Sequence, residues 1–235
     1  MDTSPKISLN EKKIFHELSF LSEDPELRTV IKNCVAAQKK TSEEMLKNSF
    51  KPGDRAAREV SPEALDEILK RGEAINGIRT EREISNVIVF KDKAYADAVF
   101  GEELAAAREK VDQGVVRKMR GLFKEGAGLE VRGSGFFLYP PQGYMGWHTN
   151  WQNPGWRLYI NYAEEPGKSF FRYRDADTGK IVTSLDREFN VRLFRVSEDK
   201  PFWHAVYSDT YRYSLGFKIT KTPGIFQRLH RKFSK

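Results

Sequence analysis

The chain has 235 residues, of which 39% are hydrophobic and 31% are charged. These proportions are ordinary for a globular protein, and the length allows one well-buried domain with extensions or two small domains. No apolar run approaches the ~20 residues that span a bilayer, and the N-terminus lacks the apolar segment of a secretory signal. We therefore expect no membrane span and no secretion.

Cys34 is the single cysteine. An intrachain disulfide is therefore excluded, and a reducing, cytoplasmic compartment is expected. Cys34 lies in a stretch with helical spacing, and we interpret it as a small buried hydrophobe rather than a nucleophile.

The net charge of +7 is partly local, because residues 218–235 contain six Lys/Arg and no Asp/Glu. A solvated basic tail over residues 221–235 is the simpler interpretation. Attraction to nucleic acid or anionic lipid stays open as the alternative.

The region 1–128 is expected to be helix-rich and to pack on a separate core. Glycine is a poor helix former, so we expect its last helix to break near Gly114. Ser61 followed by Pro62 predicts a capped helix start. The segment 84–90 (ISNVIVF) predicts a short strand that this region contributes to the core. Apolar residues at helical spacing predict helices over 22–48, 61–75 and 92–124.

From Val131 onward, β-branched and aromatic residues come in short runs separated by turn signals. The segment 175–179 (DADTG) suits a hairpin loop between two of these runs. Seven short strands without intervening helices favour a β-sandwich or barrel over 129–220 and argue against a parallel doubly wound sheet. The predicted strands are 131–139, 156–163, 169–174, 180–185, 189–196, 202–207 and 211–219.

Two of the four histidines lie in this β-rich half. His148 follows a Pro-Pro/Gly loop in YPPQGYMGWHTN, and His204 lies on a predicted strand in PFWHAVY. His16 and His230 lie in a helical context and in the basic tail, respectively. A lone histidine beside aromatic residues is more often a hydrogen-bonded core residue than a ligand, so neither is decisive alone.

The combination with residues 212–214 is more informative. A non-haem iron oxygenase binds its metal through two imidazoles and one carboxylate on one face, with the first histidine and the acid spaced H-x-D. The far carboxylate of 2-oxoglutarate needs a cation, which a strand arginine supplies through two parallel hydrogen bonds. Arg212 meets this need, and Ser214 points to the same face of the strand.

Over residues 131–219 the sequence resembles the 2-oxoglutarate/iron(II) oxygenase superfamily, and within it the prolyl-4-hydroxylase-like group. The motifs that carry the resemblance are Tyr139, GYMGWHTN, RLYINY, NVRLFRV, His204 and RYSLGF.

This resemblance implies a mainly β fold with N-terminal helices (α+β), built on a double-stranded β-helix, or jelly-roll. It implies a hydroxylase that uses Fe(II), 2-oxoglutarate and O2, with ascorbate as an accessory cofactor, on a peptide or small molecule. His148 and His204 would bind iron, and Tyr139, Arg212 and Ser214 would contact 2-oxoglutarate.

Asn150 departs from the pattern, which has Asp or Glu at this position. Asparagine offers a neutral oxygen in place of a carboxylate, so the charge of the metal is less compensated. Asn150 either ligates iron as the third catalytic and metal-binding residue, or leaves the position to water or an anion, as in halogenases. The other interpretations are a degenerate site that binds without turnover and a carboxylate supplied from elsewhere in the chain, with Asp175, Asp177, Asp186 and Asp209 as candidates.

Trp151 and Trp156 lie in the loop after Asn150, and we weigh substrate contact equally with packing for both. Trp203 precedes His204 on the same predicted strand, so its side chain should face the other way and serve packing. Two rivals to the oxygenase interpretation remain: a non-catalytic jelly-roll binding protein, and a nucleic-acid-directed protein that uses the basic tail.

Overall fold

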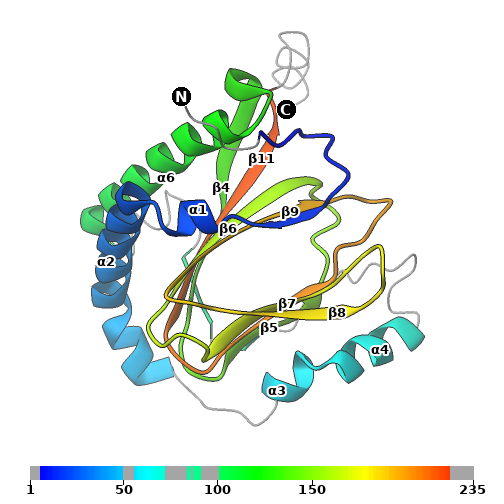
Figure 1. Ribbon diagram of the computed structural model, residues 1–235. Helices are drawn as coiled ribbons and strands as arrows, with labels where there is room; N and C mark the ends of the chain where they lie inside the picture. Colours follow the sequence, from blue (N-terminus) through cyan, green and yellow to red (C-terminus); the bar gives the residue numbers. More distant parts are fainter. Residues whose placement is uncertain (1–5, 50–55, 72–83, 86, 91–100, 223–235) are drawn as a thin grey trace, which may run out of the picture.

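The computed structural model describes residues 6–49, 56–71, 84–85, 87–90 and 101–222, and its core consists of two antiparallel β-sheets (Figure 1). One sheet has six strands in the order β1-β9-β6-β11-β4-β3, and the other has five in the order β2-β5-β10-β7-β8. The strands are β1 (Phe15–Glu17), β2 (Ile84–Ser85), β3 (Ile88–Val89), β4 (Leu129–Tyr139), β5 (Gly143–His148), β6 (Gly155–Ala163), β7 (Ser169–Arg174), β8 (Ile181–Leu185), β9 (Phe189–Val196), β10 (His204–Ser208) and β11 (Arg212–Lys221).

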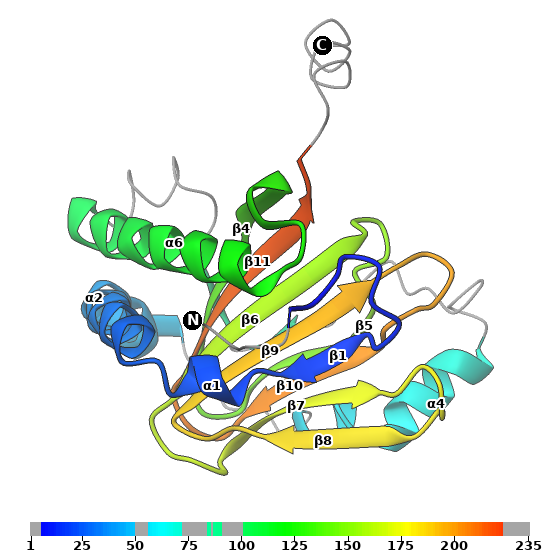
Figure 2. The ribbon, with the colours of Figure 1, turned by 45° about the horizontal axis from the view of Figure 1, so that its top comes forward.

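Helices cover the outer faces of the two sheets, as Figures 1 and 2 show. The long helices α2 and α6 lie over the six-stranded sheet, while α3 and α4 pack on the five-stranded sheet. The helical segments are α1 (Ser19–Ser22), α2 (Pro25–Ser49), α3 (Ala56–Glu59), α4 (Pro62–Lys70), α6 (Glu102–Leu122) and the 3-10 turn η2 (Gly126–Gly128).

Alternation along the strands sends side chains to the two faces of each sheet. On β6, Trp156, Leu158 and Ile160 join the core beneath the helices. Tyr159 points the other way, into the space between the sheets, where it meets Phe171 and Phe194. The functional candidates lie on these inward faces, so the β-sandwich positions them directly.

The architecture agrees with the predicted mainly β class with helices, and every strand pair is antiparallel in the part of the chain that the structure describes. The 175–179 loop joins the paired strands β7 and β8, with Gly179 at a positive φ of 72°. The Ser61 side chain caps α4 by accepting from the Ala64 amide at 3.1 Å. Both local predictions are confirmed.

Four local predictions were wrong. His16, expected in a helical context, lies on the short strand β1, which pairs with β9. Residues 143–148, interpreted as loop, form the fully buried strand β5. Its glycines and the preceding Pro-Pro pair are typical of loops and led to the wrong interpretation. The single strand expected over 84–90 is two short strands, and β2 and β3 belong to different sheets. Helix α6 runs unbroken through Gly114, which is buried, because packing against α2 outweighs the low helix propensity of glycine. Residues 52–54, 72–75, 91–100 and the tail from 223 lie outside the described residues, so the predictions there are untested.

Cys34 is completely buried in the core between α2 and α6, as its interpretation as a small hydrophobe requires. Burial is the main cause that raises the pKa of its thiol to about 12. Within the described residues, no helix is long and apolar enough to cross a membrane.

Candidate functional site

The two candidate histidines lie side by side between the sheets. His148 ends β5 and His204 begins β10, and the antiparallel register places the two residues opposite each other. Their ring centroids are 4.1 Å apart, and both residues are buried, with His204 fully so. Two residues far apart in sequence are therefore brought together by strand pairing alone.

Backbone carbonyls fix the tautomers of both imidazoles. Nδ1 of His148 lies 2.7 Å from the Gly146 carbonyl oxygen, and Nδ1 of His204 lies 2.9 Å from that of Phe202. Because a carbonyl oxygen only accepts, Nδ1 carries the proton in each neutral ring and Nε2 keeps its lone pair. Metal-ligating histidines are commonly oriented by such a bond from the other ring nitrogen.

Asn150 completes this group. Its side-chain nitrogen lies 3.3 Å from Nε2 of His204, so the amide donates toward the lone pair of the imidazole. Its backbone has a positive φ of 57°, a conformation that asparagine and aspartate tolerate better than most residues. Rotation of the amide would present the side-chain oxygen to the same point, so the donor set of two imidazoles and one amide fits a divalent metal.

Aromatic rings surround His204. The ring centroids of Phe194 and Phe171 lie 5.1 and 5.5 Å from that of the imidazole, and Tyr159 follows at 6.5 Å. The histidine pair therefore lies in a largely apolar environment, where electrostatic interactions are stronger than in water.

Arg212 lies at the first position of β11 and is fully buried. Its Nε donates to Asp186 at 2.7 Å, while Nη1 and Nη2 have no hydrogen-bond partner among the described residues. Its guanidinium carbon lies 5.3 Å from the ring centroid of Tyr139, the residue paired with it on β4. A buried guanidinium edge with two unpartnered donors fits a carboxylate ligand.

Asp186 joins two buried arginines. Its carboxylate accepts from Arg212 and, at 2.6 Å, from Nη1 of Arg192, and the Ser169 hydroxyl adds a third bond at 2.7 Å. Burial alone would raise the pKa of Asp186, but the two arginines and the hydrogen bonds lower it from 3.8 to about 2. Asp186 is therefore ionised at neutral pH.

Ser214 lies two residues along β11 from Arg212, opposite Asn161 on β6. The Asn161 side-chain nitrogen donates to the Ser214 hydroxyl at 2.9 Å, and the Asn161 side-chain oxygen accepts from Arg192 at 3.2 Å. Arg192 and Asn161 were not predicted as site residues, and Asp186 was named only as one of four candidates for the missing metal-binding carboxylate. The signal that could have found them is a polar residue at an inward position of an otherwise apolar strand.

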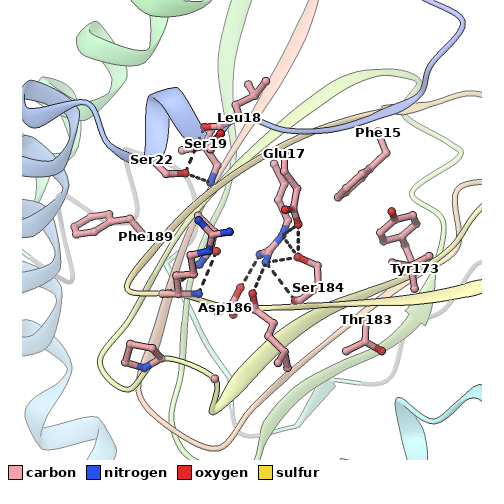
Figure 3. Close-up of a pocket in the computed structure, with 18 residues that line it drawn as sticks. Phe15, Glu17, Leu18, Ser19, Ser22, Tyr173, Thr183, Ser184, Asp186 and Phe189 are labelled. Carbon is pink, nitrogen blue, oxygen red and sulfur yellow. Dashed lines mark hydrogen bonds and ion pairs between the residues drawn. The ribbon is translucent and has the colours of Figure 1, made fainter.

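A cavity of about 830 Å³ lies between the edge strands β1 and β8, beside this cluster (Figure 3). Phe15 and Tyr173 stack at one side of it with ring centroids 4.2 Å apart, and Asp186 and Arg192 contribute to its wall. The residues lining this cavity do not include His148, Asn150, His204 or Arg212.

The tryptophans near the two histidines differ in their surroundings. Trp156 is buried beneath the helices, and its Nε1 donates to the Leu9 carbonyl at 2.9 Å, so the structure does not bring it to the histidines. Of the two roles weighed for Trp156, this burial favours packing. Trp151 follows Asn150 and is partly exposed. Trp203 packs in the cluster beneath α3 and α4, on the face away from His204, as expected.

Within the ranges that the structure describes, no further carboxylate forms a metal-binding group with the histidine pair. Among the described residues, no group of three His, Cys, Asp or Glu side chains could hold a metal. Asp186 is held by arginines, Asp175 accepts from the backbone and hydroxyl of Thr178, and Asp177 pairs with Lys200. The alternative of a carboxylate supplied from elsewhere therefore finds no support in this part of the chain.

No protein-family model matches the sequence, and no curated protein matches it significantly. Similar solved structures include a prolyl-4-hydroxylase from Pseudomonas putida, with 18% identity, a TM-score of 0.41 and coverage of 68% of this chain and 85% of that chain. The Arabidopsis thaliana dioxygenase for auxin oxidation 1 has 12% identity, a TM-score of 0.40 and coverage of 94% and 93%. A prolyl hydroxylase from Trichoplax adhaerens has 13% identity, a TM-score of 0.38 and coverage of 92% and 99%. At these values the likeness assigns no role to any residue of this chain.

Proposed function

We propose that this protein is an Fe(II)- and 2-oxoglutarate-dependent oxygenase that hydroxylates a peptide or small molecule. The observation that carries the proposal is the pairing of His148 with His204, each with Nδ1 held by a backbone carbonyl, in the same sandwich interior as a buried arginine with two unpartnered donors.

The strand order supports a jelly-roll as the core of this enzyme. The eight strands β4–β11 divide into two groups of four, β9-β6-β11-β4 and β5-β10-β7-β8. Two sheets of four antiparallel strands, with successive strands distributed between them, are the arrangement of a double-sheet jelly-roll. The remaining strands β1, β2 and β3 extend the sheets at their edges, and residues 1–128 would thus buttress the core.

His148 and His204 would bind the metal through Nε2, with Nδ1 of each ring held by a backbone carbonyl. Asn150 would turn its side-chain oxygen to the metal in place of the usual carboxylate. Iron with bound 2-oxoglutarate would supply the oxidation: O2 and 2-oxoglutarate are consumed, succinate and carbon dioxide are released, and a C–H bond becomes C–OH.

Arg212 would grip the distal carboxylate of 2-oxoglutarate with Nη1 and Nη2, and Ser214 would donate a further hydrogen bond. Tyr139 lies against the guanidinium and would border the same ligand. The rings of Phe171, Phe194 and Phe202 pack against His204 and would exclude water from the metal. This chain therefore contributes orientation, charge and a dry interior, while the cofactors supply the oxidising power.

The second candidate is a carboxylate-binding protein without turnover. Asn150 favours it, because the described residues provide only two of the three charged or imidazole ligands that such a metal centre normally has. Such a protein would still use Arg212 for its ligand.

An anaerobic titration of the metal-free protein with Fe(II) and 2-oxoglutarate distinguishes the two candidates. The oxygenase should develop a weak visible charge-transfer band, which His204→Ala abolishes. Arg212→Ala should weaken 2-oxoglutarate binding far more than metal binding. Binding of 2-oxoglutarate without any metal retention would support the second candidate, and retention of neither would contradict both.

A further inference from the structure

Three side chains on neighbouring strands form a hydrogen-bond chain whose direction is fixed. Arg192 on β9 donates through Nη1 to Asn161 on β6 at 3.2 Å. A guanidinium can only donate, so Asn161 must turn its oxygen to Arg192 and its NH2 group to Ser214. The Ser214 oxygen accepts that bond at 2.9 Å, so its own hydrogen is left to donate elsewhere.

A second branch leads from Arg192 to Arg212. Nη1 of Arg192 donates to one oxygen of Asp186 at 2.6 Å, and the other oxygen accepts from Nε of Arg212 at 2.7 Å. Arg192 is itself held in place, because its Nε and Nη2 donate to the Ser184 hydroxyl at 3.0 and 2.7 Å. Asp186 thus holds Arg212 through Nε, and Nη1 and Nη2 remain as a pair of donors for a ligand.

We infer that Arg192 is a positioning residue that orients both carboxylate-binding donors, Arg212 through Asp186 and Ser214 through Asn161. The inference rests on the proposed function and adds what the ligand must be at that end: a planar carboxylate with a single negative charge. Arg192 does not touch this ligand. Its role is to set the donor direction of the two groups that do.

The charges of the cluster select the same ligand. Arg192, Arg212 and Asp186 are each at most 1% exposed, and the trio carries one surplus positive charge. Glu17 lies 3.7 Å from Nε of Arg192, but its side chain is 51% exposed and is therefore solvated. A buried charge without a partner is costly, and a ligand carboxylate at Nη1 and Nη2 of Arg212 would compensate it. A neutral ester would not.

The relay through Asn161 can be reversed by one isosteric change. In Asn161→Asp the new carboxylate still accepts from Arg192 but also accepts from the Ser214 hydroxyl, which then no longer donates to a ligand. We expect 2-oxoglutarate to bind the Mn(II)-loaded Ser214→Ala variant about tenfold more weakly than wild type, as for loss of a bond to a charged group. Asn161→Asp should bind at least as weakly, and the double variant should bind no more weakly than Asn161→Asp alone.

Calorimetry on these four proteins provides the test, with 2-oxobutyrate, which lacks the distal carboxylate, as the matched probe. Its affinity and that of Mn(II) alone should stay within twofold of wild type in all four, which a merely structural defect would not allow. Additive losses of the two single variants would overturn the relay through Asn161.

Arg192→Lys tests the positioning role of Arg192 directly. It keeps the positive charge but cannot bond Asp186, Asn161 and Ser184 together, so 2-oxoglutarate affinity should fall more than tenfold while 2-oxobutyrate affinity holds. Unchanged 2-oxoglutarate affinity would overturn the inference, and if the variant does not fold, the Asn161–Ser214 cycle decides alone. If the wild-type protein binds Mn(II) but not 2-oxoglutarate, both the proposed function and this inference are overturned. If the wild-type protein binds 2-oxoglutarate and the variants bind it equally well, only this inference is overturned.

Discussion

Asn150 directs its side-chain nitrogen at Nε2 of His204, 3.3 Å away, at the point where a metal-binding carboxylate would be expected. On the proposed function, this amide would decide how strongly the histidine pair holds a divalent cation. Two neutral imidazoles and a neutral amide leave the cation charge uncompensated, whereas a carboxylate would supply both a ligand and a negative charge.

The first prediction follows from that charge. Asn150→Asp keeps the size of the side chain and tolerates the positive φ, so the fold should be unaffected. We expect Mn(II) to bind at least about tenfold more tightly, since one charge-assisted interaction is worth about 1.5–3 kcal/mol. Calorimetric titration of the metal-free protein measures it, with Asn153→Asp in the following turn as the control. Equal affinities in wild type and Asn150→Asp would mean that residue 150 does not face the metal.

The second prediction concerns the buried carboxylate. Asp186→Asn removes the only charge partner of Arg212 within the described residues and leaves two buried guanidiniums poorly compensated. Breaking such a pair costs about 3–5 kcal/mol of unfolding free energy. Glu188→Gln is the control, because Glu188 pairs with Arg28 and Lys32 at the partly exposed surface, where loss should cost at most about 1 kcal/mol. Urea unfolding compares the two variants. Similar losses of unfolding free energy would contradict the burial of the Asp186 ion pairs.

The third prediction gives the pH dependence of that contribution. The pKa of Asp186 is lowered to about 2 in the folded protein, against an ordinary value of 3.8. A lowered pKa contributes stability above the unfolded value and loses it as the pH falls toward the folded value. The stability difference between wild type and Asp186→Asn should therefore be constant above about pH 5 and shrink by on the order of 2 kcal/mol between pH 5 and pH 2. A difference that stays constant over this interval in urea titrations would show that Asp186 is not so perturbed.

Local patterns predicted much of the fold and named part of the candidate site. Alternation in WRLYINYA and FNVRLFRV predicts β6 and β9, and the R-x-S spacing places Arg212 and Ser214 on one face. Strand β5 was missed because its glycines and the preceding prolines suggest a loop, although it is buried along its whole length and lies between β2 and β10.

The cluster around Asp186 could not be predicted, because it depends on which strands become neighbours. Asp186 follows β8 in one sheet, while Arg192 and Arg212 lie on β9 and β11 of the other. Alternation fixes the face of each side chain, but neither spacing nor composition states that these three faces meet. The sequence left two roles open for Trp156 for the same reason. Its place beside the loop did not reveal that β6 begins one residue earlier and that its ring packs beneath the helices.

The fourth prediction separates the two tryptophans that follow Asn150. Trp156→Phe removes the bond to the carbonyl of the half-buried Leu9 and takes volume from a fully buried side chain, which should cost about 1–3 kcal/mol of unfolding free energy. Trp151→Phe affects a partly exposed ring in a turn and should cost less than about 1 kcal/mol. Urea unfolding of both variants measures these costs, and Mn(II) affinity should be unchanged in Trp156→Phe because its ring lies on the helix side of the sheet. If Trp156→Phe lost metal affinity without losing stability, Trp156 would have to contribute to the site rather than to packing.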